Sequence, residues 1–115
     1  MHFPIVEIDS SYYSIMPQSN YQKWVNQTTA DFSFIVKAYG GITGHSRQNY
    51  SKEEQILLLT PFLESIQPLI ETNKLNGILF QFPPWFNCKK ENVELLRTLK
   101  SKLKGLPAIL EFRNQ

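Results

Sequence analysis

The chain alternates between short apolar runs and segments in which apolar residues recur at helical spacing. The apolar runs cover residues 3–10, 31–38, 76–84 and 108–113, and each ends in polar residues or prolines. Runs of this length, rich in β-branched and aromatic residues, predict β-strands. The segments between them repeat apolar residues at i, i+3, i+4 and i+7, which predicts helices. The predicted order is therefore β-α-β-α-β-α-β.

Local signals predict where the first and last helices begin and end. Ser19 with Gln22 has the spacing of a capping box, in which each side chain bonds the other residue's backbone N–H at a helix start. At the end of the last helix, three lysines precede Gly105 and Pro107, a sequence typical of a helix C-terminus.

The middle helical segment has a second capping box, Ser51 with Glu54, and extends to about residue 72. Pro61 and Pro68 should kink or divide it, because proline lacks the N–H that a helix interior needs. Thr60 could serve as a new N-cap in front of Pro61, so two consecutive helices are an alternative. Before this segment, the three glycines of "YGGITGHSRQNY" predict a long exposed loop.

The alternation of strands and helices determines the expected fold class. Strands joined by helical crossovers must be parallel, with right-handed connections and the helices outside. We therefore expect an α/β domain spanning residues 1–115. In such folds, ligands bind at the carboxyl ends of the strands, in barrels and open sheets alike.

Composition excludes several classes of protein. The chain has 115 residues, of which 42% are apolar and 19% charged, enough to form a core and too few charges for a disordered segment. A net charge of +2 does not favour a nucleic-acid or membrane partner. No run reaches the roughly 18 apolar residues of a membrane span. With no signal-peptide pattern and a single cysteine, Cys88, the sequence fits a reducing cytoplasm.

Each predicted strand carries polar residues near its C-terminal end. Because side chains alternate along a strand, Glu7 and Asp9 share one face, and so do Glu111 and Arg113. We expect these side chains to form a polar ring above an apolar floor, at the end of the sheet where ligands bind. The ring comprises Glu7, Asp9, Lys37, Gln81, Glu111 and Arg113.

Several roles are open to the charged members of this ring. Glu111 and Arg113 could form a buried structural ion pair, although their position at a strand end favours a functional role. Lys37 follows the apolar "FSFIV" and could act as a nucleophile or base. It could equally neutralise Glu7 or Glu111, and electrostatic binding of an anionic substrate is the role that we favour.

Two further residues lie next to the predicted strands. His45, in "GITGHSR", could transfer protons or could simply be an exposed loop residue. Tyr12 follows the first strand and could stack on a ligand or cover the core. No metal-binding spacing such as H-E-x-x-H occurs, so we expect no metal site, and no pattern identifies a cofactor.

The motifs in four parts of the chain resemble those of the domain of unknown function 72 family, also called YecE-like. They occur in the family's order and are "VEIDSSYYSIMP", "FSFIVKAYGGITGH", "ILFQFPPWF" and "LEFRNQ". The resemblance implies a TIM barrel, of which this chain is a fragment lacking the first strand and the C-terminal half. Asp9 stands where the family usually has asparagine, and Asn114 where histidine is common. The family implies no particular reaction.

Two functional hypotheses follow. In the first, the chain is part of a barrel enzyme that acts on a small polar or anionic molecule, with Glu7, Lys37 and Glu111 catalytic. The expected substrate-binding residues are Asp9, Tyr12, His45, Gln81 and Arg113. In the second, the barrel binds a ligand or nucleic acid without catalysis. A partial barrel should be an open four-stranded sheet that self-associates through its exposed edges.

Overall fold

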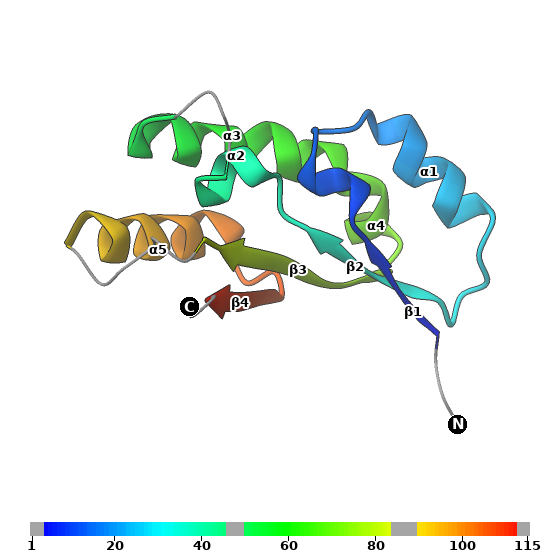
Figure 1. The fold of residues 1–115 in the computed structure, drawn as a ribbon. Helices are drawn as coiled ribbons and strands as arrows, with labels where there is room; N and C mark the ends of the chain where they lie inside the picture. The colour runs from blue at the N-terminus through cyan, green and yellow to red at the C-terminus, as the bar shows by residue number, and fades with distance from the viewer. Residues whose placement is uncertain (1–3, 46–49, 84–89, 113–115) are drawn as a thin grey trace.

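The computed structural model describes residues 4–45, 50–83 and 90–112, which form a four-stranded parallel sheet with helices on one face. The strands lie side by side in chain order, and each neighbouring pair is parallel (Figure 1). They are β1 (Ile5–Ile8), β2 (Ser33–Lys37), β3 (Leu75–Phe82) and β4 (Ala108–Phe112). The predicted strands and their order are confirmed, with ends that differ by one or two residues at several positions.

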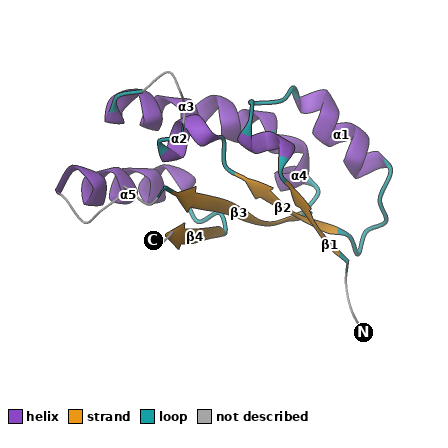
Figure 2. Ribbon diagram, in the orientation of Figure 1, coloured by secondary structure: helices purple, strands orange, loops and turns teal. Residues whose placement is uncertain are grey.

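Helical segments connect each strand to the next and cover the same side of the sheet (Figure 2). A short 3₁₀ helix, η1 (Ser10–Tyr12), and α1 (Gln18–Asn26) follow β1, and α5 (Lys90–Leu103) follows β3. The connection from β2 to β3 contains α2 (Gly40–Thr43), α3 (Lys52–Ser65) and α4 (Gln67–Glu71).

The hydrophobic core lies between the sheet and these helices. Along β3, Ile78, Phe80 and Phe82 are buried, whereas Leu79 and Gln81 between them stay partly exposed. This alternation shows that only one face of the sheet is covered. Each large apolar side chain buried on that face contributes roughly 1.5–3 kcal/mol to folding. The helices, together with Ile66 between α3 and α4, contribute Tyr21, Leu59, Phe62, Ile66, Leu69, Leu95, Leu99 and Leu103.

One of the two predicted capping boxes forms. Glu54 N donates to Ser51 Oγ at 3.2 Å, and Ser51 N donates to Glu54 Oε1 at 3.0 Å, so α3 begins as predicted. The box predicted at Ser19 is wrong, because α1 begins at Gln18, directly after the extended backbone of Pro17. Ser19 therefore already lies inside the first turn. At the end of α5, Gly105 has the left-handed φ of 85° that its position predicted.

The break between α3 and α4 does not occur where Thr60 suggested. Pro61 lies inside α3, and the helix ends at Ser65, with Ile66 between it and α4. Pro61 is on the exposed side, where water can take the place of its missing N–H. Pro68 instead sits in the first turn of α4, a position at which proline is well tolerated.

The first part of the predicted loop is wrong, because residues 40–43 form the buried helix α2, and residues 46–49 of that loop lie outside the described residues. The glycines allow close packing. A Cβ on Gly40 would lie 3.2 Å from the ring of Tyr12, and one on Gly41 would lie 2.5 Å from Cε2 of Tyr39. Glycine occupies these two positions because the tyrosine rings approach the backbone closely, and not because the backbone is flexible.

Helices cover β4 incompletely. Ile109, Leu110 and Phe112 are 42%, 50% and 48% exposed, although Phe112 stacks on Phe82 with ring centroids 5.4 Å apart. The last strand thus presents apolar side chains to solvent on both faces. Within the described residues, no helix is both long enough and apolar enough to cross a membrane.

Candidate functional site

The sheet places four of the predicted polar residues on the face that carries no helix, which we call the open face. Strand register sets this arrangement, since Glu7 pairs with Ile35, Lys37 with Leu79, and Gln81 with Glu111. Register partners in a parallel sheet point to the same face. We call Glu7, Lys37, Gln81 and Glu111 the polar layer.

The polar layer lies at the C-terminal ends of the strands, above an apolar floor. Lys37 is the last residue of β2, and Gln81 and Glu111 are each one residue from the end of their strands. The floor consists of Ile35, Leu79 and Ile109, which lie two residues before Lys37, Gln81 and Glu111 on the same strands. This is the end of an α/β sheet at which ligands bind.

A pair of carboxyl groups occupies one side of the site. A side-chain hydrogen bond between Glu7 and Asp9 raises the pKa of Glu7, and the negative charge of Asp9 and partial desolvation raise it further. Lys37 acts in the opposite direction, and the charge of Glu111 adds a small increase to the same pKa. The pKa of Glu7 therefore lies above that of an isolated glutamate, and Glu7 holds its proton more strongly.

Gln81 bonds directly to Glu111. Its Nε2 donates to Glu111 Oε1 at 3.0 Å, across the register pair that joins β3 and β4. This contact explains why an amide interrupts the apolar sequence "ILFQF", because the amide faces the open side and has a carboxylate partner. With one oxygen of Glu111 bonded in this way, the carboxylate is held in place on the open face.

Aromatic residues adjoin Lys37. Its Nζ lies 5.0 Å from the centroid of the Tyr12 ring, the distance of a cation–π contact. The rings of Tyr13 and His45 each meet Tyr12 edge to face, at centroid distances of 5.1 and 5.3 Å. Thr43 Oγ1 lies 2.9 Å from His45 Nδ1, a hydrogen bond that orients the imidazole. Tyr12 and His45 are thereby brought into one group with Lys37.

A buried serine ties the two strand ends of this group together. Ser11 Oγ lies 3.1 Å from the carbonyl oxygen of Ile8 and 2.6 Å from that of Lys37, so its single proton joins β1 to β2. The close fit of Tyr12 on Gly40 adds a second link between the same two connections. These contacts hold the polar layer in place before any ligand binds.

Sequence reasoning missed Ser11 and Thr43 as supports of the site. Neither belongs to a catalytic or binding motif. Ser11 bonds the backbone of Lys37, 26 residues away, and Thr43 bonds His45, two residues away. The long-range bond of Ser11 in particular has no local sequence signal. Tyr13 is also part of the group and is 78% exposed beside Tyr12.

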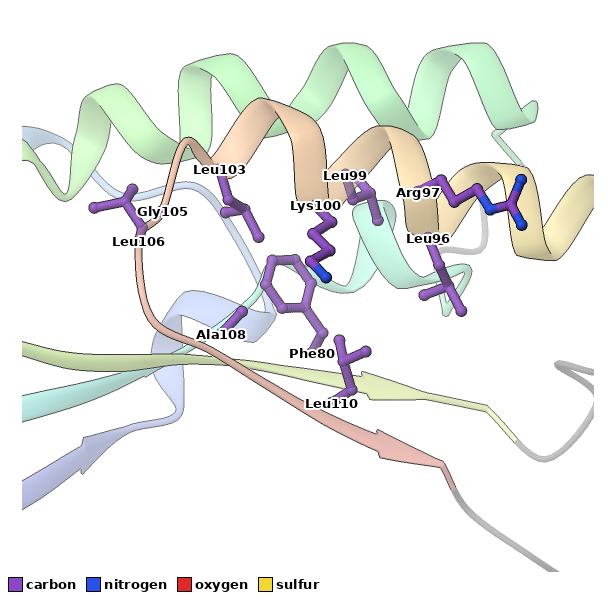
Figure 3. A pocket seen from close by; sticks show the side chains of 10 residues that line it. All are labelled: Phe80, Leu96, Arg97, Leu99, Lys100, Leu103, Gly105, Leu106, Ala108 and Leu110. Atoms are coloured by element: carbon purple, nitrogen blue, oxygen red, sulfur yellow. The ribbon is translucent and has the colours of Figure 1, made fainter.

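Arg113, the remaining predicted binding residue, lies outside the described residues, as does Cys88. A cavity of about 470 Å³ is lined by α5, β3 and β4, but it lies on the helix-covered side and contains none of the predicted site residues (Figure 3). Among the described residues, no group of three or more His, Cys, Asp or Glu side chains is arranged to hold a metal ion.

The fold and this layer define the class of protein: a parallel α/β chain forming part of a barrel, with polar side chains at the strand ends. The chain belongs to the family described as protein of unknown function DUF72, whose model matches residues 1–115. The expected family and the expected fold class are both confirmed.

Similar proteins are considerably longer than this chain. The UPF0759 protein YunF of Bacillus subtilis is 50% identical over 114 residues, which are 99% of this chain and 40% of that protein. A solved DUF72 family protein from Enterococcus faecalis is 43% identical, with a TM-score of 0.85 over 98% of this chain and 45% of its own. A Thermotoga maritima DUF72 protein is 31% identical, with a TM-score of 0.71 over 95% and 41%. The chain thus spans about two fifths of these relatives.

Proposed function

We propose that the polar layer is the substrate site of an enzyme that acts by proton transfer on a small polar or anionic molecule. The observation that carries this proposal is the hydrogen-bonded Glu7–Asp9 pair, with a raised Glu7 pKa, on the same open face as Lys37. A carboxyl group whose pKa is moved toward neutrality is suited to act as a general acid and then as a base.

The other residues have complementary roles in this proposal. Lys37 is partly exposed and carries the positive charge that attracts an anionic group of the substrate. Glu111, oriented by Gln81, accepts a proton or a hydrogen bond from a substrate hydroxyl. Tyr12 and His45 line the same site as binding residues, with Tyr12 against Lys37. The arrangement supplies an acid, a base and an anion-binding group in one place.

The alternative is a barrel that binds a small ligand without catalysis. A nucleic-acid ligand is less well supported, since the described site has three acidic residues, Glu7, Asp9 and Glu111, and one lysine. Phosphate backbones are bound mainly by clusters of positive charge. The two remaining possibilities differ in whether a bound molecule is converted.

Ligand binding is tested by thermal shift with a panel of small anions, namely inorganic phosphate, hydroxy acids and phosphorylated sugars. We expect at least one class to raise the Tm of the wild-type chain and to lose this effect in Lys37→Met. Lys23→Met is the matched control, because Lys23 is exposed on α1, outside the polar layer, and this variant should respond as the wild type does. An equal shift in Lys37→Met would contradict the proposed role of Lys37.

Catalysis is tested separately with the anion that binds. We expect NMR spectra recorded over time to show conversion, or exchange of a substrate proton with solvent deuterium, by the wild type. Glu7→Gln should bind the same anion and lose this activity by about 10²–10⁴-fold, the usual contribution of a general acid or base. Binding without any conversion or exchange by the wild type would favour the non-catalytic barrel.

A further inference from the structure

Exposed apolar side chains are concentrated on the two edge strands of the sheet. Seven large apolar residues are exposed in the described part of the chain, and five of them lie on β1 or β4. These are Ile5 (53%), Val6 (40%), Ile109 (42%), Leu110 (50%) and Phe112 (48%). Such a concentration marks an association surface.

Within the part of the chain that the structure describes, each of these two strands has one edge without a strand partner, since β1 pairs with β2 and β4 pairs with β3. Ser33 N donates to the Pro4 carbonyl at 3.1 Å, so the backbone of Pro4 faces β2. Because backbone groups alternate in direction along a strand, Ile5 directs its N–H away from β2, toward the free edge. This edge can accept another parallel strand.

The stagger of the polar layer indicates what kind of strand pairing would complete the sheet. The register partner of Glu7 on β2 is Ile35, and Lys37 lies two residues further along that strand. The register partner of Lys37 on β3 is Leu79, and Gln81 lies two residues further along. Gln81 and Glu111 are direct partners. The layer therefore advances four positions from β1 to β4. An eight-stranded TIM barrel closes with a total stagger of about eight positions, twice this value.

We propose that two copies of this chain associate about a two-fold axis, with β4 of each copy pairing in parallel with β1 of the other to close an eight-stranded barrel. Four strands from each copy give the strand number of a TIM barrel. This proposal does not depend on the catalytic one.

The stagger also specifies the register at each new junction. A total of eight positions is reached when Glu111 pairs directly with Glu7 of the second copy. The same register places Ile109 beside the second copy's Ile5 on the inner face. It places Leu110 beside the second copy's Val6 on the outer face. Exposed apolar residues thus meet each other at both junctions, which is favourable for pairing.

The closed dimer would make the polar layer a composite site. Glu111 of one copy would adjoin Glu7 of the other, so each copy would contribute acidic groups to the opposite half of the layer. Two neighbouring carboxylates repel when both are ionised. The raised pKa of Glu7 reduces this cost, because its proton is retained to higher pH.

The oligomeric state and the register are tested on the 115-residue chain. Light scattering should give one species with twice the 13.4 kDa of the chain. In a Cys88→Ser background, the pair Ile5→Cys and Ile109→Cys should form interchain disulfides on mild oxidation. The control pair Val6→Cys and Ile109→Cys is displaced by one residue, which puts the thiols on opposite faces, and should not cross-link.

A substitution at the free edge tests the same junction without thiols. Ile5→Pro removes the outward N–H and should raise the dimer dissociation constant about tenfold for each of the two junctions. The control Leu57→Ser, which removes an apolar side chain that is 68% exposed on α3, should leave it unchanged. A monomer at all concentrations, an open-ended series of masses, or equal cross-linking by both cysteine pairs would overturn the proposal.

Discussion

Gln81 and Glu111 occupy paired positions on β3 and β4, and Gln81 Nε2 donates a hydrogen bond to Glu111 Oε1 at 3.0 Å. The pair lies on the open face, while the neighbouring Phe80 is only 1% exposed in the core. Adjacent residues of one strand therefore have different tasks. Phe80 stabilises the fold, and Gln81 positions a carboxylate of the candidate site.

The first prediction separates these two tasks. Gln81→Leu should change the free energy of unfolding by less than about 1 kcal/mol, because water can replace a partly exposed hydrogen bond. Phe80→Ala should cost about 3–5 kcal/mol by removing a buried aromatic ring. Urea unfolding at one protein concentration measures both. A loss as large for Gln81→Leu as for Phe80→Ala would show that the amide has a structural role.

The second prediction concerns the pH dependence of Glu7. Its pKa is raised above the ordinary value of 4.5, so between these two values the folded state binds more protons than the unfolded state. The contribution of Glu7 to stability is therefore greatest below the ordinary pKa and falls as the pH rises toward the raised one. Above the raised pKa, this dependence ends.

Asp9→Asn tests the cause of that shift. The substitution removes the charge of Asp9 and alters its side-chain hydrogen bond with Glu7, and these are the two largest causes of the raised Glu7 pKa. An NMR titration of the Glu7 side-chain carboxyl should show the pKa moving down toward its ordinary value. Asp31→Asn, at an exposed position before β2, is the control and should leave the Glu7 titration unchanged. An unchanged Glu7 pKa in Asp9→Asn would contradict the carboxyl pair.

The third prediction concerns the contact between Lys37 and Tyr12. A double-mutant cycle with Lys37→Met and Tyr12→Leu should give a coupling energy of about 0.5–1 kcal/mol, the range for a partly solvated cation–π pair. The measurement is the free energy of unfolding of the four proteins. Tyr12→Phe keeps the aromatic ring and should retain most of the coupling. Strictly additive effects would mean that the ring does not hold the lysine.

The sequence predicted the strands and the polar layer because both follow from short-range periodicity. Alternation along β3 is sufficient to place Gln81 on the face opposite Phe80, and the parallel order aligns the strand ends. The partner of a residue on a neighbouring strand cannot be predicted in this way. That Gln81 bonds Glu111, 30 residues away, depends on the register between strands, which no local pattern encodes.

Packing against distant residues accounts for the features that sequence reasoning did not find. The glycines of α2 suggested a loop because glycine is frequent in turns, but Gly41 lies against Tyr39, Tyr50 and Leu58 in a compact arrangement. Ser11 looked like any polar residue after a strand, yet it is buried and bonds the backbone of β2. Both properties exist only once the connections after β1 and β2 have come together.

The last prediction tests this close packing at Gly41. In Gly41→Ala the new Cβ would lie 2.5 Å from Tyr39 Cε2 and 3.0 Å from side-chain carbons of Leu58 and Tyr50, so at least one ring must move. We expect a loss of about 1–3 kcal/mol in the free energy of unfolding, the usual cost of overpacking. Helix propensity alone would favour alanine by up to about 1 kcal/mol, so the sign of the change decides between the two effects.

The ionisation of Tyr39 gives a second measurement for the same variant. Burial and the side-chain hydrogen bond with Tyr50 raise the pKa of Tyr39 in the wild type. Displacement of its ring should expose it and lower that pKa, which an ultraviolet titration of tyrosinate can follow. Gly105→Ala is the control, because no atom lies within 4 Å of the added Cβ and its φ of 85° imposes only backbone strain. That variant should lose about 1 kcal/mol and leave Tyr39 unchanged, whereas a stabilised Gly41→Ala would show that α2 is loosely packed.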